Sequence, residues 1–179
     1  MAACGADTTF LLVDCAKQHN EQIRVIILNT HRNQTGMENK GKTADPGNSG
    51  TACSIEPWLS VRDSARALNF YKAAFGAGEV FLLEDPGGGG LVANLSINGA
   101  TFWIGEESPQ HGNFSPASHG GGTVRIILTV ADPDHMFARA LGAGASQVFP
   151  VGEEYGWKLG RLKDPFGHDW EIGHPLETK

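Results

Sequence analysis

An internal repeat in the last two thirds of this 179-residue chain limits its possible folds more than any other feature. Residues 59–63 (LSVRD) match residues 128–132 (LTVAD) at an offset of about 69 positions. Residues 76–81 (GAGEVF) match residues 144–149 (GASQVF) at an offset of about 68 positions. Because both matches occur at nearly the same spacing, they indicate a supersecondary unit that occurs twice in the chain. One such unit would leave its sheet edge and its apolar face exposed, so we expect the two copies to pair.

The first unit reads as a strand, a helix and three strands. Residues 55–61 predict the first strand, and Asp63 is the expected N-cap of a helix that ends at Gly76. The sequence Asn98-Gly99 is typical of a tight turn between two strands. The three later strands of this unit are expected over residues 80–83, 91–97 and 101–104.

The second unit follows a polar connection over residues 106–122 and shows the same order. Asp132 is the expected N-cap of its helix, with Pro133 at the favoured first position. Its four strands are expected over residues 123–130, 147–150, 158–163 and 169–172. Two βαβββ units predict an α+β fold in which two half-sheets form a curved mixed sheet around a shared cleft.

The first 53 residues differ in character from the rest. Residues 10–13 and 23–28 have strand-like patterns, but residues 29–51 are almost wholly polar and contain several glycines. We therefore predict a largely disordered N-terminal extension over residues 1–53. The remaining bounds are a domain over residues 54–176, with modules at 55–106 and 123–173, and a tail over residues 177–179.

Composition excludes several classes of partner. The formal net charge of -6 argues against nucleic acid, which is bound by basic surfaces. No apolar run is long enough to cross a bilayer, and the N-terminus lacks the pattern of a signal peptide, so we predict a cytoplasmic protein without a membrane partner. Cys4, Cys15 and Cys53 have no metal-binding spacing and are expected to be reduced thiols.

Specific residues now carry a family resemblance. The stretches WLSVRD (58–63), ALNFY (67–71), FGA (75–77), DPFGH (164–168) and WEI (170–172) are similar to the first strand and helix and the last hairpin of the vicinal oxygen chelate superfamily. Its members include glyoxalase I, the bleomycin-resistance proteins and the extradiol dioxygenases. The resemblance implies the glyoxalase/bleomycin-resistance fold and a homodimer. It leaves open whether a reaction is catalysed, because this fold hosts enzymes and binding proteins alike.

The resemblance also implies where a site would lie, because enzymes of the superfamily bind a divalent metal with ligands from the first and last strands of each unit. The repeat places those positions at Glu56, Trp103, Arg125 and Glu171. Tryptophan has no available lone pair, and arginine is a permanent cation that repels a metal. We therefore predict a centre without a metal or other cofactor, in which the guanidinium replaces the metal charge and faces the two carboxylates.

Three functional hypotheses remain open at this point. The first is a small-molecule-binding protein similar to the bleomycin-resistance branch, holding a polar aromatic or cationic compound between Trp103 and the charged centre. The second is a metal-dependent lyase, isomerase or dioxygenase that uses Glu56 and Glu171 with a further ligand such as His168. The third is an ion-pair cluster that only stabilises the fold. Trp103 is the expected stacking surface, whereas Trp58, Trp157 and Trp170 are expected in the core and His168 at the surface.

Overall fold

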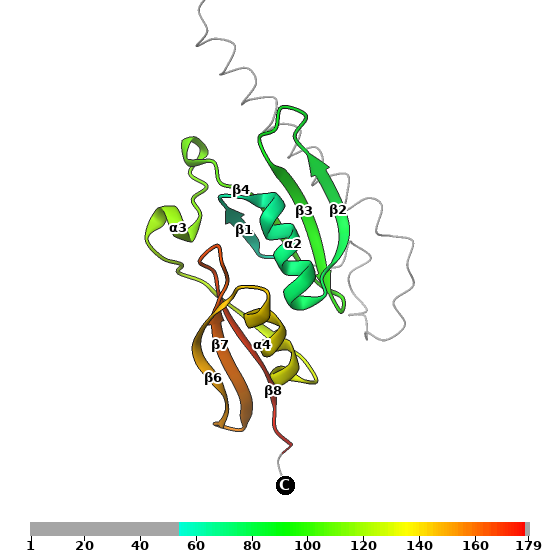
Figure 1. Ribbon diagram of the computed structural model, residues 1–179, viewed down its shortest axis with the longest axis vertical. Helices are drawn as coiled ribbons and strands as arrows, with labels where there is room; N and C mark the ends of the chain where they lie inside the picture. The colour runs from blue at the N-terminus through cyan, green and yellow to red at the C-terminus, as the bar shows by residue number, and fades with distance from the viewer. Residues whose placement is uncertain (1–53, 178–179) are drawn as a thin grey trace, which may run out of the picture. The chain divides into compact units, whose positions relative to one another are not determined.

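The computed structural model describes residues 54–177, which fold as two βαβββ modules (Figure 1). Contacts divide the whole chain into residues 1–52 and 53–179. The predictions made for residues 1–53, namely disorder, two strands and three reduced cysteines, lie outside the described residues, and the domain bounds stay a prediction. Within the described part, no helix is long and apolar enough to span a membrane.

Module 1 forms a four-stranded sheet with the strand order β1-β4-β3-β2. Strand β1 runs parallel to β4, and the other neighbouring strands are antiparallel. The first strand is shorter than predicted, because Ile55 is 95% exposed and pairing begins only after Pro57. The elements of this module are β1 (Trp58–Val61), α2 (Ser64–Phe75), β2 (Gly78–Glu84), β3 (Leu91–Ile97) and β4 (Ala100–Glu106).

Module 2 repeats this arrangement with the order β5-β8-β7-β6. Its elements are β5 (Arg125–Thr129), α4 (Pro133–Gly142), β6 (Ser146–Glu154), β7 (Trp157–Lys163) and β8 (Asp169–Pro175). The connection between the modules contains two short helices that the sequence did not predict, the 3-10 turn η2 (Pro109–His111) and α3 (Pro116–His119). The predicted α+β fold with two βαβββ modules is confirmed, with the difference that the modules form two separate four-stranded sheets.

Local signals in the sequence set the ends of the elements. The side chain of Asp63 accepts a hydrogen bond from the Arg66 amide at 2.9 Å, and Asp132 caps α4 in the same way. Helix α2 ends at Gly76, whose φ of 66° is the left-handed conformation that glycine adopts most easily. Asn98 and Gly99 both have positive φ, as the predicted hairpin turn requires.

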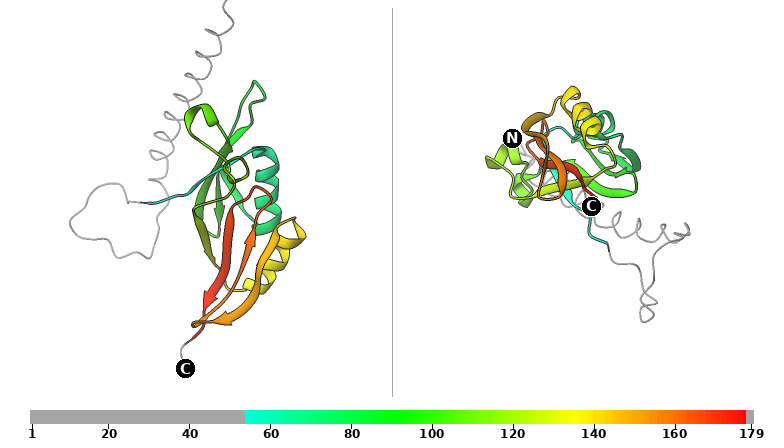
Figure 2. Two further views of the ribbon diagram at one scale, coloured as in Figure 1. Left: turned by 90° about the vertical axis from the view of Figure 1, so that its left-hand side faces the viewer. Right: turned by 90° about the horizontal axis from the view of Figure 1, so that it is seen from below.

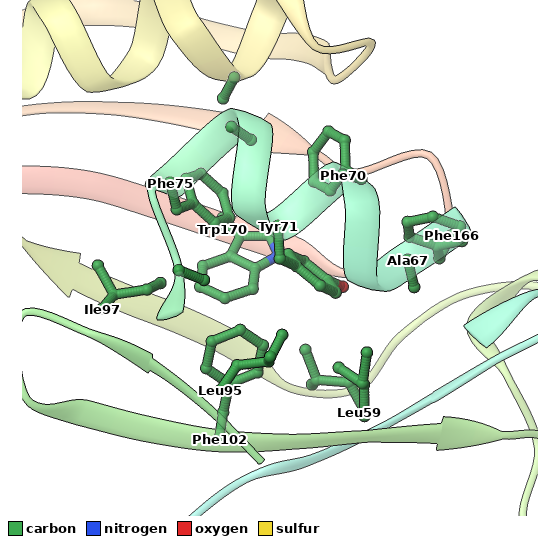
Figure 3. Close-up of a cluster of buried hydrophobic side chains, with 14 of the residues drawn as sticks. Leu59, Ala67, Phe70, Tyr71, Phe75, Leu95, Ile97, Phe102, Phe166 and Trp170 are labelled. Carbon is green, nitrogen blue, oxygen red and sulfur yellow. The ribbon is translucent and has the colours of Figure 1, made fainter. Parts of the chain in front are cut away.

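The two modules are joined through their helices. Helices α2 and α4 lie side by side on the same side of the sheets (Figure 2). The Arg139 guanidinium in α4 donates to the Ala73 carbonyl in α2. Trp170 of β8 is 1% exposed and inserts among the aromatic rings of module 1, 4.7 Å from Phe75 and 5.8 Å from Phe102 between ring centroids (Figure 3). The predicted position of Trp170 in the core is therefore confirmed, and this core is shared by both modules.

A buried carboxylate completes this joint. Asp164, at the end of β7, is 4% exposed and accepts hydrogen bonds from the Tyr71 hydroxyl at 2.7 Å and the Trp170 indole at 3.0 Å. Its other oxygen accepts from the amides of Phe166 and His168. Because burying a carboxylate is costly unless it is hydrogen-bonded, these four donors are what allow Asp164 to lie between the modules.

Candidate ligand-binding site

Each sheet has one face covered by its helix and one face turned away from it. Phe102 of β4 packs against Tyr71 of α2, so strand alternation places the next residue, Trp103, on the opposite face. In module 2, Trp170 and Ile172 of β8 are core residues, so Glu171 between them points the other way. We call the sides of the two sheets that carry Trp103 and Glu171 the helix-free faces.

The strand register aligns one row of residues across each helix-free face. In module 1 the row across β1, β4, β3 and β2 consists of Trp58, Trp103, Asn94 and Phe81. In module 2 the corresponding row across β5, β8, β7 and β6 consists of Ile127, Glu171, Arg161 and Phe149. The two rows occupy matching positions of the repeat, so the same sheet position carries different chemistry in each module.

Glu56 lies just before β1 and is held by three neutral donors. The Trp103 indole donates to its carboxylate at 2.7 Å, the Asn94 amide at 2.9 Å and the Thr101 hydroxyl at 2.9 Å. None of these donors carries a charge. Among residues 54–177, no cation forms an ion pair with Glu56, so its negative charge is hydrogen-bonded but not neutralised.

Aromatic rings cover this part of the sheet. The Trp58 and Trp103 indoles are stacked, with centroids 6.0 Å apart and ring planes inclined by 12°. Phe81 lies 5.9 Å from Trp103, although Asn94 stands between them in the row. Asn94 is consequently only 2% exposed, and its Oδ1 is buried without a hydrogen-bond partner in the described chain.

The corresponding face of module 2 is dominated by ion pairs. Arg125 of β5 forms an ion pair with Glu171 of β8, and Arg161 and Lys163 of β7 both bind Asp169, at 3.1 and 3.0 Å. Burial works to raise the pKa of Asp169, but the hydrogen bonds from Lys163 and Arg161 outweigh it and leave that pKa below its ordinary value. Three cations thus face two carboxylates, and the Arg161 Nε is buried without a partner within the described residues.

The structure places the four residues singled out in the sequence in two separate pairs. Glu56 binds Trp103 within module 1, and Arg125 binds Glu171 within module 2. In the described part of one chain, no hydrogen bond or ion pair joins the first pair to the second. The expected contact of Arg125 with Glu171 is present, whereas Glu56 takes its hydrogen bonds from neutral groups instead of from Arg125.

These residues do not fit a divalent metal ion. No group of three His, Cys, Asp or Glu side chains in residues 54–177 is arranged to hold one. Both oxygens of Glu56 already accept hydrogen bonds, and Glu171 is paired with a permanent cation. His168, the further ligand considered for a metal, is half-buried and donates from its Nε2 to the Ser60 carbonyl at 3.1 Å. Its role in the structure is a contact between the modules.

Sequence reasoning missed several members of the two faces. Trp58 was expected in the core, but it is 37% exposed and stacks on Trp103, so that expectation was wrong. For Asn94, a usable signal lay in the Asn98-Gly99 turn. A two-residue hairpin fixes the strand register, and this register sets Asn94 beside Trp103. The residues that neither periodicity nor motif had singled out are Asn94, Thr101, Phe81, Arg161, Lys163 and Asp169.

Comparison with known sequences identifies relatives of this chain. A sequence model of the Glyoxalase/Bleomycin resistance protein/Dioxygenase superfamily matches residues 53–172. An uncharacterized protein of Mycobacterium bovis is 40% identical over 126 residues, which cover 68% of this chain and 83% of that protein. An uncharacterized protein of Arabidopsis thaliana is 34% identical over 113 residues, covering 58% of this chain and 67% of that protein.

Solved structures share the same fold. A gene product of Arabidopsis thaliana aligns with a TM-score of 0.55 and 30% identity, over 69% of this chain and 99% of that one. TioX from Micromonospora sp. ML1 aligns with a TM-score of 0.54 and 26% identity, over 70% of this chain and all of TioX (100%). The fosfomycin resistance protein FosX of Mesorhizobium loti, at 16% identity and a TM-score of 0.51 over 69% of this chain and 92% of its own, is similar in fold alone.

Proposed function

This chain belongs to the glyoxalase/bleomycin resistance protein/dioxygenase superfamily, and we propose that it binds a small organic molecule on the helix-free faces of its modules without a metal ion. One observation carries the proposal. The positions at which the superfamily resemblance implies metal ligands hold a Glu56–Trp103 pair and an Arg125–Glu171 pair. Each carboxylate is thus engaged by a donor of this chain, and indole and guanidinium groups supply stacking and anion-binding chemistry instead of metal ligation.

We further propose that the protein is a homodimer in which module 1 of one copy covers module 2 of the other. Two large apolar side chains of the module 2 row remain exposed, Ile127 at 65% and Phe149 at 58%. The charges of the two faces are also complementary. Module 1 presents a carboxylate without a cation, and module 2 presents three cations for two carboxylates. Such a dimer would place Glu56 of one copy on the opposite side of a shared ligand site from Arg125 and Glu171 of the other.

The test combines metal analysis with a binding screen. Protein purified without chelator is analysed for Mn, Fe, Ni and Zn, and its melting temperature is then measured with panels of small anionic, neutral aromatic and cationic compounds. We expect far less than one metal equivalent per chain. We also expect at least one compound class to raise the melting temperature, an effect that Trp103→Phe or Arg125→Met weakens.

The same measurements test the rival hypothesis of a metal-dependent enzyme. About one tightly bound metal per chain that is lost in Glu171→Gln would replace the proposal by a metal-dependent lyase, isomerase or dioxygenase. Absence of metal together with no stabilising compound, and an Arg125→Met variant that is as stable as the wild type, would leave only a structural role for these pairs.

A further inference from the structure

We propose that the helix-free face of module 1 binds a planar organic cation that donates N–H hydrogen bonds, with Glu56 as its counterion and the Trp58–Trp103 pair as its stacking surface. This inference rests on the proposed function and names the class of ligand. Candidates of this chemistry are amidinium, guanidinium and protonated heteroaromatic groups.

The charge of Glu56 is the first argument. Its three hydrogen-bond partners, Trp103, Asn94 and Thr101, hold the carboxylate in place but leave its charge uncompensated within the described part of its own chain. A bound cation would supply that charge, and its N–H groups would add charge attraction to their hydrogen bonds with the carboxylate. An anion placed on the same face would meet a fixed negative charge and no cationic donor from the described part of module 1.

The indole pair is the second argument. The rings of Trp58 and Trp103 are nearly parallel, and the bond from the Trp103 Nε1 to Glu56 sets the orientation of its ring. Trp58 remains 37% exposed, so part of the stacked pair is available to a ligand. Tryptophan is the aromatic side chain that attracts cations most strongly, and planar cations stack on it as well. The indoles and the carboxylate therefore favour the same class of ligand.

Asn94 is the third and independent argument. Its Nδ2 donates to Glu56, which can only accept, so the orientation of the amide is settled and its Oδ1 must be the buried, unpartnered atom. An unpaired buried acceptor destabilises the protein until a donor reaches it. The side chain is 2% exposed beneath Trp103 and Phe81. A ligand N–H that displaces the Phe81 ring, with Trp103 kept in place by Glu56, would supply the missing donor.

Module 2 has the opposite character at the matching position. Arg161 occupies the place that Asn94 occupies in module 1, and its buried unpartnered atom is a donor, the Nε. Cations outnumber carboxylates on that face. The two faces therefore favour opposite ends of a ligand. The face of module 1 favours the cationic end, and the face of module 2 favours an end that carries hydrogen-bond acceptors.

The experiment uses three probes of similar shape and a fourth, bulkier cation with the full-length protein. Benzamidinium is a planar cation with N–H donors, benzamide is its neutral counterpart, benzoate is its anionic counterpart, and phenyltrimethylammonium is a cation without N–H groups. Binding is followed by NMR through the indole N–H of Trp103 and the side-chain amide of Asn94. We expect benzamidinium to bind at least about tenfold more tightly than each of the other three probes.

Two variants test whether Glu56 causes the preference for benzamidinium. Glu56→Gln keeps the shape of the side chain and removes its charge, and it should weaken benzamidinium binding about tenfold and abolish the preference over benzamide. Glu84→Gln removes an exposed carboxylate from β2 of the same module and should leave all four affinities unchanged. If Glu56→Gln does not fold, the comparison of the four probes on the wild type remains decisive.

The inference is overturned if benzamide or benzoate binds as tightly as benzamidinium, if benzamidinium gives no NMR shifts up to about 10 mM, or if Glu56→Gln leaves its affinity intact. Its failure is distinguishable from failure of the proposed function. A neutral or anionic compound whose stabilising effect is lost in Arg125→Met would keep the binding function and discard the cation. Absence of any stabilising compound would discard both.

Discussion

Asp164 shows how one residue can hold two repeated modules together. It belongs to module 2, but it accepts a hydrogen bond from Tyr71 of module 1 as well as from Trp170. Burial, followed by the charge of Asp164, raises the pKa of Tyr71 well above its ordinary value, so the phenol stays protonated and remains a donor. The stability of the joint therefore depends on the carboxylate more than on any single donor.

We expect Asp164→Asn to lower the free energy of unfolding by about 3 kcal/mol, because an amide cannot accept at both ends and would turn N–H groups toward other donors. Tyr71→Phe removes one of the four donors and should cost about 1 kcal/mol. Urea unfolding of the two variants measures both values. A loss below about 0.5 kcal/mol in Asp164→Asn would contradict this account of the joint.

His168 should make folding sensitive to pH. Burial lowers its pKa, against the smaller raising effects of Asp164, Asp169 and the Ser60 carbonyl, while Lys163 lowers it further. The unfolded chain therefore takes up a proton more readily than the folded chain. Stability contributed by neutral His168 should be fully present above the unfolded pKa of about 6.5 and should be lost as the pH falls from there through the lower folded pKa.

We expect His168→Gln, which can still donate to the Ser60 carbonyl, to show a shallower loss of stability than the wild type between about pH 8 and about pH 5. Urea unfolding at several pH values gives the two slopes. Replacement of the exposed His111, which lies in the connection between the modules, serves as the control and should leave the wild-type slope unchanged. Parallel curves for the wild type and His168→Gln would show that His168 does not cause the pH dependence.

At the scale of elements, local chemistry was predictable and tertiary contacts were not. The caps at Asp63 and Asp132 and the Asn98-Gly99 turn were predicted because each depends on neighbours within a few residues. The start of β1 depends on pairing with the distant strand β4, so periodicity alone did not find it. Helix α3 has local caps at Ser115 and Gly120, but its four residues are too few to show a helical period. The repeat placed Glu56 and Arg125 in equivalent positions, but it could not tell whether one chain brings them together.

Strand β4 offers a test of the indole pair that leaves its polar groups untouched. A Cβ added at Gly105 would lie 2.6 Å from the Trp58 ring, so the indole can lie on the sheet only because this residue is glycine. We expect Gly105→Ala to move the Trp58 ring outward and to weaken the near-UV circular dichroism of the stacked pair, at a cost of about 1–3 kcal/mol. Gly152→Ala is the matched control, because a Cβ at Gly152 meets nothing within 4 Å. An unchanged tryptophan signal in Gly105→Ala would rule out the stacked arrangement.

For the whole molecule, the central question is what covers the helix-free faces. The core that joins the modules lies on the helix side, around Trp170 and Tyr71. Ile127 and Phe149 face away from it and are largely exposed, so a charged substitution there should not unfold the chain. In the proposed homodimer, the same substitution would place a charge in an apolar interface.

We therefore expect the wild type to sediment as a dimer at about 10 µM and Ile127→Asp to sediment as a folded monomer. Tyr155→Asp is the control, because Tyr155 is 98% exposed at the β6–β7 hairpin and lies outside the module 2 row. Sedimentation velocity gives the mass, and far-UV circular dichroism confirms folding. A monomeric wild type, or a dimer that Ile127→Asp does not dissociate, would refute pairing through this face.

Mixing two variants that have each lost tight ligand binding tests whether a partner copy completes the site. If module 1 of one copy covers module 2 of the other, Glu56→Gln and Arg125→Met damage opposite halves of each site. A dimer made from one chain of each kind then contains one site with both substitutions and one site with neither. Random mixing and reassociation should restore tight ligand binding at about a quarter of all sites, whereas each variant alone restores none.

If both halves came from one chain, every site would keep one substitution and calorimetric titration of the mixture would detect no tight sites. For a compound whose tight binding each substitution alone abolishes, the stoichiometry of the mixture therefore separates a shared site from two independent ones.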